Sequence, residues 1–340
     1  MKEKRSGDEV NMDKNTLFKM VQQYTGDKPL LLIGTGGTIP YGIPGMNKLA
    51  EHLISALGDK YNSDSGWDTF ITRINTGLDL ESALTDINLK DAIINDIIMQ
   101  TWLLVSDADI DLLTKILSDK EMLPLSQLIY KMYTPTPQCV NIITTNYDRV
   151  IEYACDQVKL PTDVRFSGNY FKSFSNSEIK SRNIVNLIKV HGSLDMFKDK
   201  DNFVYSIPLQ RTIPSGFIPE IITPGANKYR ALLTSQCADM KHQADNLVEK
   251  AKSFLCIGYG FNDSQIQRNI IEGIKNGKPI VVVTKQLSDA AAGLIINSSS
   301  KYVIIQEDTD DSTKSDIFIN KERFQIEGTY WTVEGLLNII

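Results

Sequence analysis

The sequence predicts an α/β fold: a doubly wound, Rossmann-like parallel sheet with a helical insertion and no zinc ribbon. Short apolar runs alternate along the chain with longer stretches of helical spacing, which is the order of elements in such sheets. Most of these runs end in glycine or polar residues, as parallel strands do at the edge that faces ligands. The 340 residues suffice for one large domain or two ordinary ones.

The first elements are typical of a nucleotide-binding fold. Residues 1–28 are predicted to form a charged lead-in, without the apolar core of a secretory signal, and a helix over 14–24. The apolar run "KPLLLIG" predicts a buried strand that ends at Gly34. The loop "GTGGTIPYGIPG" follows, and then an amphipathic helix over 46–57.

The rest of the sheet is predicted from apolar runs that follow a helical insertion over residues 58–133. These runs cover 138–145, 183–193, 253–263, 278–285 and 301–308. The run at 278–285 is rich in β-branched residues, as in a strand covered on both faces. We expect the main domain to occupy residues 29–310.

The last residues are expected to dock on the same domain. The acidic "DTDDSTKSD" (308–316) is predicted to be an exposed loop. Within the segment 311–340, "GTYWTVEGLLNII" predicts a terminal helix that docks through Trp331, Leu336 and Leu337.

Composition excludes several classes of function. No apolar run approaches the roughly 20 residues that cross a bilayer, so we expect a cytoplasmic protein without a membrane partner. The net charge of −6 argues against a broad face for nucleic acid. The four cysteines are widely spaced and form no C-x-x-C pair, so neither a metal site nor a disulfide framework is predicted.

The glycine loop is a candidate diphosphate site. Gly34, Gly36 and Gly37 directly follow a predicted strand, where glycines let the backbone approach a pyrophosphate closely. The loop is not a G-x-G-x-x-G fingerprint, because Ile39 stands where the third glycine would be. A tight turn without a ligand is the alternative.

Polar residues follow two further strands. In "NIITTNYDRVIEYA", Thr145, Asn146 and Asp148 lie where a strand ends and a helix begins, so they are candidates for chemistry or for helix capping. His191 ends the run "NIVNLIKVHGS" and is a candidate general base, with a structural role as the alternative.

The motif "GYGFNDSQI" follows the next apolar run. Gly258 and Gly260 come directly after the strand, and Asn262 and Asp263 lead into a predicted helix. This motif predicts either a second surface against a nucleotide or a turn that is capped by Asp263.

Together, "GTGGTIP", "TTNYD", "KVHGS" and "GYGFND" resemble, in this order, the SIR2-like branch of the sirtuin superfamily that is found in bacterial antiphage defence proteins. The resemblance extends from about residue 30 to residue 284. It implies hydrolysis of NAD, as substrate, to nicotinamide and ADP-ribose. It also implies catalytic roles for Asn146, His191 and Asp148. The NAD-binding residues it implies are Gly34, Gly36, Gly37, Thr38, Thr145, Gly258, Asn262, Asp263 and Thr284.

The chain departs from protein-deacylating sirtuins, which bind zinc through two cysteine pairs that are absent here. An NAD-dependent protein deacylase is therefore a weaker alternative. A non-catalytic module that binds NAD or ADP-ribose and regulates a partner is another. Because an unrestrained NADase would kill its host, we expect gating by homo-oligomerisation or by a separate partner such as a HerA-type ATPase. The contact surface is expected at 58–133, which could instead form a lid.

Overall fold

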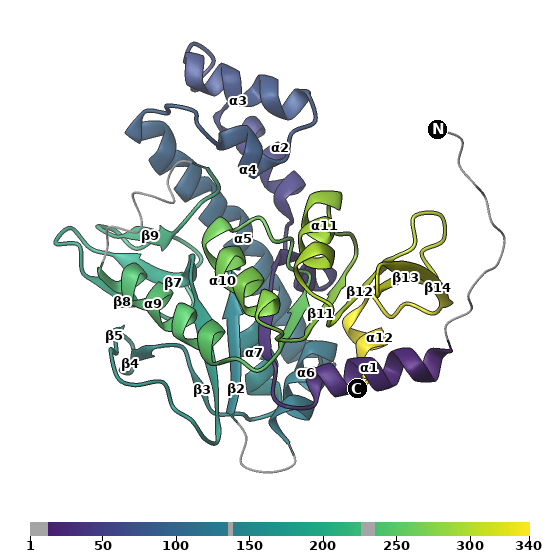
Figure 1. The fold of residues 1–340 in the computed structure, drawn as a ribbon. Coiled ribbons are helices and arrows are strands. Elements are labelled where there is room, and N and C mark those ends of the chain that lie inside the picture. Colours follow the sequence, from purple (N-terminus) through teal and green to yellow (C-terminus); the bar gives the residue numbers. More distant parts are fainter. Residues whose placement is uncertain (1–12, 135–138, 226–234) are drawn as a thin grey trace.

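The main sheet is seen in the computed structural model, which describes residues 13–134, 139–225 and 235–340 (Figure 1). Within these ranges, nine strands form this sheet in the order β14-β13-β12-β11-β10-β1-β2-β6-β3. All neighbours from β12 to β3 are parallel, whereas β13 and β14 run antiparallel. The predicted doubly wound parallel sheet is confirmed, with an antiparallel extension at one edge.

The elements of this sheet and its covering helices have the following bounds. The strands are β1 (Leu30–Ile33), β2 (Cys139–Thr144), β3 (Thr162–Asp163), β6 (Ile184–Lys189), β10 (Phe254–Ile257), β11 (Ile280–Thr284), β12 (Tyr302–Glu307), β13 (Lys314–Ile319) and β14 (Glu322–Glu327). The covering helices are α1 (Lys14–Thr25), α6 (Pro124–Tyr133), α7 (Val150–Gln157), α9 (Ser235–Lys250), α10 (Ser264–Lys275), α11 (Asp289–Ser298) and α12 (Val333–Leu337).

The direction of winding reverses beside β1. From β1 the chain builds outward through β2 and β6, and then returns to place β10 on the other side of β1. Parallel pairing aligns Leu30 with Phe254 and Ile33 with Ile257, so β1 and β10 end at the same level. In sheets with this strand order, dinucleotides bind in the crevice at the carboxyl ends of the strands where the winding reverses.

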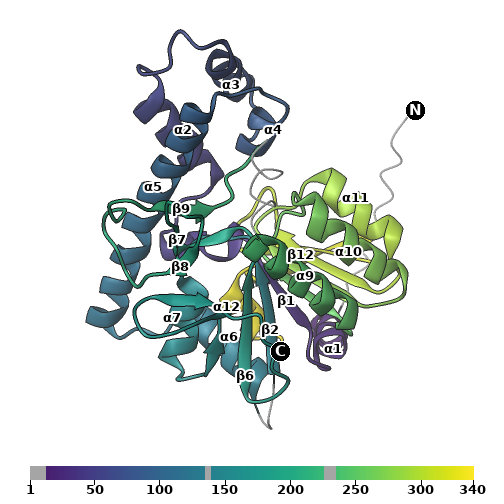
Figure 2. The ribbon, with the colours of Figure 1, turned by 90° about the vertical axis from the view of Figure 1, so that its left-hand side faces the viewer.

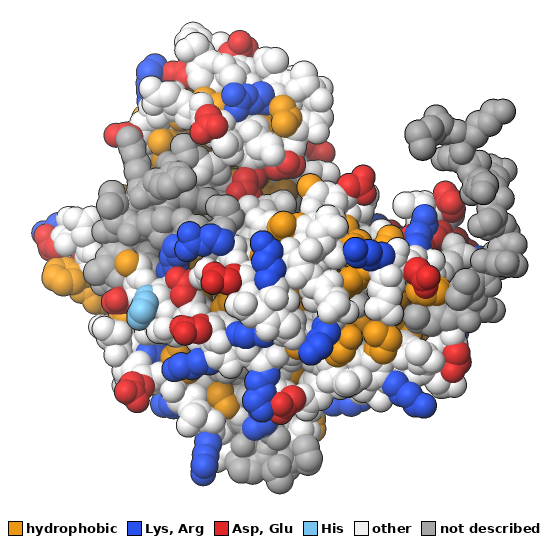
Figure 3. Space-filling model, viewed as in Figure 1, with side chains coloured by type: hydrophobic (Ala, Val, Ile, Leu, Met, Phe, Trp, Pro, Cys, Tyr) orange, Lys and Arg blue, Asp and Glu red, His pale blue; other side chains and the backbone are white. Residues whose placement is uncertain are grey.

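Alternate residues of β1 face two different apolar cores. Leu31 and Ile33 belong to a cluster with residues of α1, α6, α7 and α12. Leu30 and Leu32 belong to a second cluster with residues of α9, α10 and α11. The strand is an unbroken apolar run because both of its faces are covered. On the face covered by α9, α10 and α11, acidic and basic side chains are interspersed (Figure 3).

The segment between β1 and β2 is helical and has an apolar core of its own. After two short 3₁₀ turns, η1 (Thr35–Gly37) and η2 (Ile39–Tyr41), come α2 (Met46–Leu57), α3 (Ser65–Asn75), α4 (Leu80–Leu84) and α5 (Asp91–Asp119). Side chains of α2, α3, α4 and the first half of α5 form this core, including Trp67 and Phe70. In both views, α3 and α4 lie away from the sheet, whereas α5 extends back toward it (Figures 1 and 2).

The prediction of an exposed loop over residues 308–316 is wrong for its first residue and for its last three. Strand β13 begins at Lys314, and Asp308, Ser315 and Asp316 are buried. The next strand supplies donors to both aspartates: Arg323 Nη2 donates to Asp316 Oδ2 at 2.7 Å and Gln325 Nε2 to Asp308 Oδ2 at 2.7 Å. Further on, Leu336 of α12 is fully buried, and Trp331 and Leu337 pack against the same core.

A second, antiparallel sheet was not predicted from the sequence. Its order is β4-β5-β8-β7-β9. The strands are β4 (Phe166–Ser167), β5 (Lys172–Phe174), β7 (Gly192–Lys198), β8 (Val204–Ser206) and β9 (Ile218–Ile221). Because β7 begins one residue after His191, this histidine lies at the junction of the two sheets. A Cβ on Gly192 (φ +79) would lie 1.9 Å from the Glu220 carbonyl oxygen, so this junction requires glycine.

Candidate active site

A pocket lies at the carboxyl ends of β1, β2, β6 and β10. Its lining combines polar residues that follow these strands with residues of the helical segment between β1 and β2. The lining residues are Gly34, Thr35, Ile43, Pro44, Gly45, Met46, Leu49, Glu81, Val105, Thr145, Asn146, Tyr147, Asp148, His191, Ile222, Pro224, Tyr259, Gly260, Asn262 and Asp263. All three residues predicted to be catalytic, Asn146, Asp148 and His191, therefore line one pocket.

The glycines after β1 and β10 pack directly against each other. Gly36 N–H donates to the Gly258 carbonyl at 3.0 Å. A Cβ on Gly258, whose φ is +55, would lie 2.0 Å from the Gly37 nitrogen. Of the glycines predicted to bind NAD, only Gly34 lines the pocket, whereas Gly36, Gly37 and Gly258 allow the two turns to approach each other.

Asn146 is held by hydrogen bonds to the end of β2 and to the turn after β1. Thr144 Oγ1 donates to the Ile33 carbonyl at 2.6 Å and accepts from Asn146 N–H at 3.0 Å, which ties the end of β2 to the end of β1. Asn146 Nδ2 donates to Thr38 Oγ1 at 3.2 Å. Within the described parts of the chain, its Oδ1 is buried without a hydrogen-bond partner, as is the Tyr259 hydroxyl. Two residues of the pocket thus have polar atoms that a polar ligand could satisfy.

Asp148 lines the pocket and also accepts a hydrogen bond from the start of α7, although the N-cap of this helix is Arg149 and not Asp148. Its Oδ1 accepts from Val150 N–H at 3.2 Å, at the start of α7, and its Oδ2 accepts from Thr38 Oγ1 at 3.0 Å. Burial raises the pKa of the Asp148 carboxyl to about 6, although the positive charge of Lys189 acts in the opposite direction.

His191 is paired with Asp263 across the pocket. The distance between His191 Nε2 and Asp263 Oδ2 is 2.7 Å, and the two side chains are 15% and 9% exposed. Asp263 Oδ1 accepts from Ile266 N–H at 3.1 Å in the first turn of α10. Asp263 therefore acts as the predicted cap and also orients the imidazole, which sequence reasoning did not predict.

The remaining predicted residues lie in three different positions relative to the pocket. Thr145 and Asn262 line the pocket. Thr38 is fully buried behind it and hydrogen-bonds to Asn146 and Asp148. The structure does not bring Thr284 to the pocket: it ends β11, one strand beyond β10, and its hydroxyl donates to the Gln286 carbonyl at 3.4 Å.

Several lining residues were missed by sequence reasoning. Glu81 comes from α4 and Val105 from α5, and both helices belong to the segment between β1 and β2. Ile222 and Pro224 follow β9 of the second sheet. No local motif marks these positions, because only the packing of distant elements brings them to the pocket.

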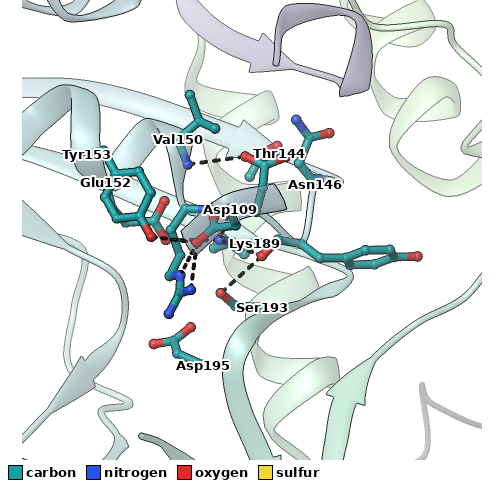
Figure 4. Close-up of polar contacts among 12 residues, drawn as sticks. Asp109, Thr144, Asn146, Val150, Glu152, Tyr153, Lys189, Ser193 and Asp195 are labelled. Atoms are coloured by element: carbon teal, nitrogen blue, oxygen red, sulfur yellow. Dashed lines mark hydrogen bonds and ion pairs between the residues drawn. The ribbon is translucent and has the colours of Figure 1, made fainter. Parts of the chain in front are cut away.

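A buried charged cluster supports the loop after β2 from behind (Figure 4). Arg149 Nη2 and Nε donate to Asp109 Oδ2 of α5 at 2.6 and 2.9 Å, and the Tyr153 hydroxyl donates to the same oxygen at 2.5 Å. Lys189 Nζ lies 2.9 Å from Glu152 Oε1. Figure 4 shows the Asn146 side chain pointing away from this cluster.

Neither a cluster of metal ligands nor a membrane-spanning helix occurs in the described part of the chain. Within residues 13–134, 139–225 and 235–340, no group of three or more His, Cys, Asp or Glu side chains is placed to hold a metal ion. Among the same residues, no helix combines the length and apolar character that spanning a membrane requires.

The sequence and the fold were compared with those of known proteins, and both comparisons found relatives of Sir2 proteins. The fold is similar to a crystal structure of a Sir2 homolog–NAD complex, with 13% identity, a TM-score of 0.43, and 86% of this chain and 89% of that chain covered. It is also similar to a structure of Sir2 bound to acetylated peptide, with 13% identity, a TM-score of 0.39, and coverage of 86% and 92%. No curated protein matches in sequence. The model of the SIR2-like domain matches residues 140–324, more than half of the sequence, and the chain therefore belongs to the SIR2-like domain family.

Proposed function

We propose that the protein is an NAD⁺ glycohydrolase that cleaves NAD⁺ to nicotinamide and ADP-ribose. The observation that carries the proposal is that Asn146 and His191 line one pocket, at the point where the winding of the sheet reverses. Dinucleotides bind at this position in doubly wound sheets. Asn and His are also the residues that the resemblance to SIR2-like NADases assigns to catalysis.

Asn146 is suited to position the nicotinamide ribose and the attacking water. Its Nδ2 donates to Thr38, which fixes the plane of the amide, and its buried Oδ1 has no hydrogen-bond partner among the residues that the structure describes. A ribose hydroxyl or a water molecule can donate to this oxygen. Holding the reacting groups in one geometry removes part of the entropic barrier.

His191 is suited to accept a proton. Its contact with Asp263 orients the ring and stabilises the imidazolium that forms when the other ring nitrogen takes a proton. In the proposed reaction the N-glycosidic bond breaks with its electrons leaving to nicotinamide, and water adds to the ribose carbon. The proton lost by that water, or by a ribose hydroxyl, goes to His191.

Asp148 is suited to stabilise positive charge. Cleavage of an N-glycosidic bond passes through a transition state with positive charge on the ribose, like an oxocarbenium ion. With a pKa of about 6, the Asp148 carboxyl is mostly ionised at neutral pH, and its burial strengthens its interaction with such a charge. Gly34 would border the diphosphate. Thr38, which lies behind the pocket, would hold the side chains of Asn146 and Asp148 in place.

The test is incubation of purified protein with NAD⁺, with and without candidate partners, followed by chromatography of the products. We expect nicotinamide and ADP-ribose in equal amounts, and little release by Asn146→Ala or His191→Ala. His52→Ala is the matched control, since His52 lies outside the pocket and contacts Gln100 of α5. Parental release rates in both pocket variants would contradict the proposal. Binding of NAD⁺ without turnover, even with every candidate partner present, would favour a non-catalytic module, and transfer of an acyl group from a peptide would favour a deacylase.

We further propose that residues 29–310 form the SIR2-like domain, that residues 311–340 complete it, and that it acts as an effector in antiphage defence. Gating through residues 58–133, by a second copy or by a HerA-type ATPase, is part of this proposal. Glu81 and Val105 support it, because helices α4 and α5 then connect a contact surface to the pocket. Light scattering beside the activity assay tests it: a fully active, stable monomer would contradict gating by assembly.

A further inference from the structure

We propose that Lys189 is a positioning residue that locks the loop carrying Asn146 and Asp148 to the strand end carrying His191. The inference rests on the proposed function, because it concerns how the proposed catalytic side chains are held in position. Lys189 is the last residue of β6, two positions before His191, and it does not line the pocket. It is 2% exposed, so its ammonium group is available only to partners inside the protein.

The partners of this ammonium are the backbone and one side chain of the loop after β2 and of α7. Lys189 Nζ donates to the Asp148 carbonyl at 2.5 Å and to the Tyr147 carbonyl at 3.3 Å. It also donates to Glu152 Oε1 at 2.9 Å. An ammonium group has three protons, and these contacts engage all of them. The two carbonyl groups follow Asn146 directly, so the contacts fix the backbone that carries both Asn146 and Asp148.

Backbone groups on both sides of His191 also bond to the end of β2 and to the loop that follows it. Leu194 N–H donates to the Tyr147 carbonyl at 3.0 Å, and Val190 N–H donates to the Thr144 carbonyl at 3.1 Å. These are backbone contacts that any side chains would allow. Two sets of contacts depend on a particular side chain. Ser193 Oγ donates to the Tyr147 carbonyl at 3.5 Å, and the shorter Lys189 contacts need a cation on a long stem.

The charges around Lys189 explain why a cation is required. The Asp148 carboxyl is buried and those of Glu152 and Asp195 are half-buried, and the positive charge of Lys189 acts to lower the pKa of all three. Without this charge, carboxylates from β7, from α7 and from the loop would face one another in a buried region, and their repulsion would separate the elements. Removing the charge of Lys189 should displace the loop after β2 first, because this loop has no regular secondary structure of its own.

The test uses Lys189→Met, which keeps the length of the stem and removes the charge. Arg165→Met is the matched control: Arg165 is also a fully buried cation, but its partners Asp163, Ser175 and Gln243 lie outside the pocket. For Lys189→Met we expect kcat for nicotinamide release to fall about 100-fold, the size of effect that misplaced reacting groups produce, with KM changed less than about threefold. Arg165→Met should retain the parental kcat below its unfolding temperature.

Hydrogen–deuterium exchange separates this inference from the proposed function. Peptides covering 144–149 and 190–194 should exchange at least about tenfold faster in Lys189→Met than in Arg165→Met. If the parent does not cleave NAD⁺ even with every candidate partner present, the proposed function fails, and the exchange result alone decides whether Lys189 holds the loop in place. Unchanged exchange in both peptides, or a parental kcat in folded Lys189→Met, would overturn the inference. If Lys189→Met does not fold, Glu152→Gln is measured in its place. For this variant we expect faster exchange in the same two peptides and a fall in kcat of about tenfold.

Discussion

His191 Nε2 lies 2.7 Å from Asp263 Oδ2, although the two residues are 72 positions apart in the chain. His191 follows β6 and Asp263 follows the turn after β10, and β2 and β1 lie between these strands in the sheet. The contact therefore spans the carboxyl ends of the two central strands, beside the turn that carries Asn146. It links the two halves of the doubly wound sheet at the pocket.

The first prediction concerns this contact. Asp263→Asn keeps an oxygen that can accept from Ile266 N–H, so the start of α10 should persist. The amide cannot stabilise an imidazolium, however, and we expect kcat for nicotinamide release to fall about 100-fold, within the usual range for acid–base groups. Steady-state kinetics measures the effect, and circular dichroism checks the fold. A folded Asp263→Asn protein with parental kcat would show that the contact has no catalytic role.

The sequence predicted those parts of the site that depend on local pattern. Asn146, His191 and Asp263 each follow an apolar run that the structure shows as a parallel strand, and the carboxyl ends of such strands share one edge. The same reasoning fails for Thr284, because its strand β11 lies one position beyond β10 in the sheet. The carboxyl edge of the sheet extends beyond the strands that border the pocket. This reasoning also fails for Glu81, whose place depends on how the helices between β1 and β2 pack.

Strands with polar residues were the weakest part of the prediction. β13 begins with "KSD", and the buried Asp316 is acceptable in this strand because Arg323 of the next strand donates to it. Gln325 of the same strand donates to Asp308, which precedes β13. The short strands of the second sheet likewise have their partners far along the chain. Such pairing is a property of register, which a single segment does not encode.

The second prediction concerns the pH dependence of stability. The pKa of Asp148 is raised in the folded state, so the folded protein binds the proton more tightly than the unfolded chain does. The free energy of unfolding should therefore fall as the pH rises from about 4 to about 6, by about 3 kcal/mol from this group, and then level off. Asp148→Asn removes the contribution.

Urea unfolding of parent and variant at pH 4 and pH 7.5 measures this difference, and contributions from other groups cancel in the comparison. Asp148→Asn should be more stable than the parent at pH 7.5, with the gain absent near pH 4. The variant should also release nicotinamide more slowly, because the stabilising negative charge is lost. An equal difference in stability at both pH values would contradict the raised pKa.

The third prediction concerns the packing of the two glycine turns. In Gly258→Ala the new methyl group meets backbone atoms of Gly36 and Gly37, and we expect a loss of more than about 3 kcal/mol in the free energy of unfolding, or no folded protein. Gly277→Ala is the control, since its φ is +89 but nothing lies within 4 Å of the added carbon. Its loss should be only the conformational cost of about 1–2 kcal/mol. Equal losses in the two variants would show that the turns can move apart.

The last prediction concerns Thr38, whose hydroxyl joins the two polar side chains of the loop after β2. Thr38→Val keeps the shape of the residue but leaves Asn146 Nδ2 and Asp148 Oδ2 without this partner. Because both side chains are buried, we expect a loss of about 2 kcal/mol in the free energy of unfolding. The Asn146 amide would also be free to rotate, so kcat should fall about tenfold while KM changes little.

Thr101→Val is the matched control for this change. Thr101 is as fully buried as Thr38, but its hydroxyl has no hydrogen-bond partner within the described residues. Replacing an unsatisfied hydroxyl by a methyl group should leave stability unchanged within about 0.5 kcal/mol or raise it. Urea unfolding and nicotinamide release, measured on both variants, separate the loss of a hydroxyl from the loss of its bonds. If Thr38→Val behaves like Thr101→Val in both measurements, Thr38 does not hold the catalytic side chains.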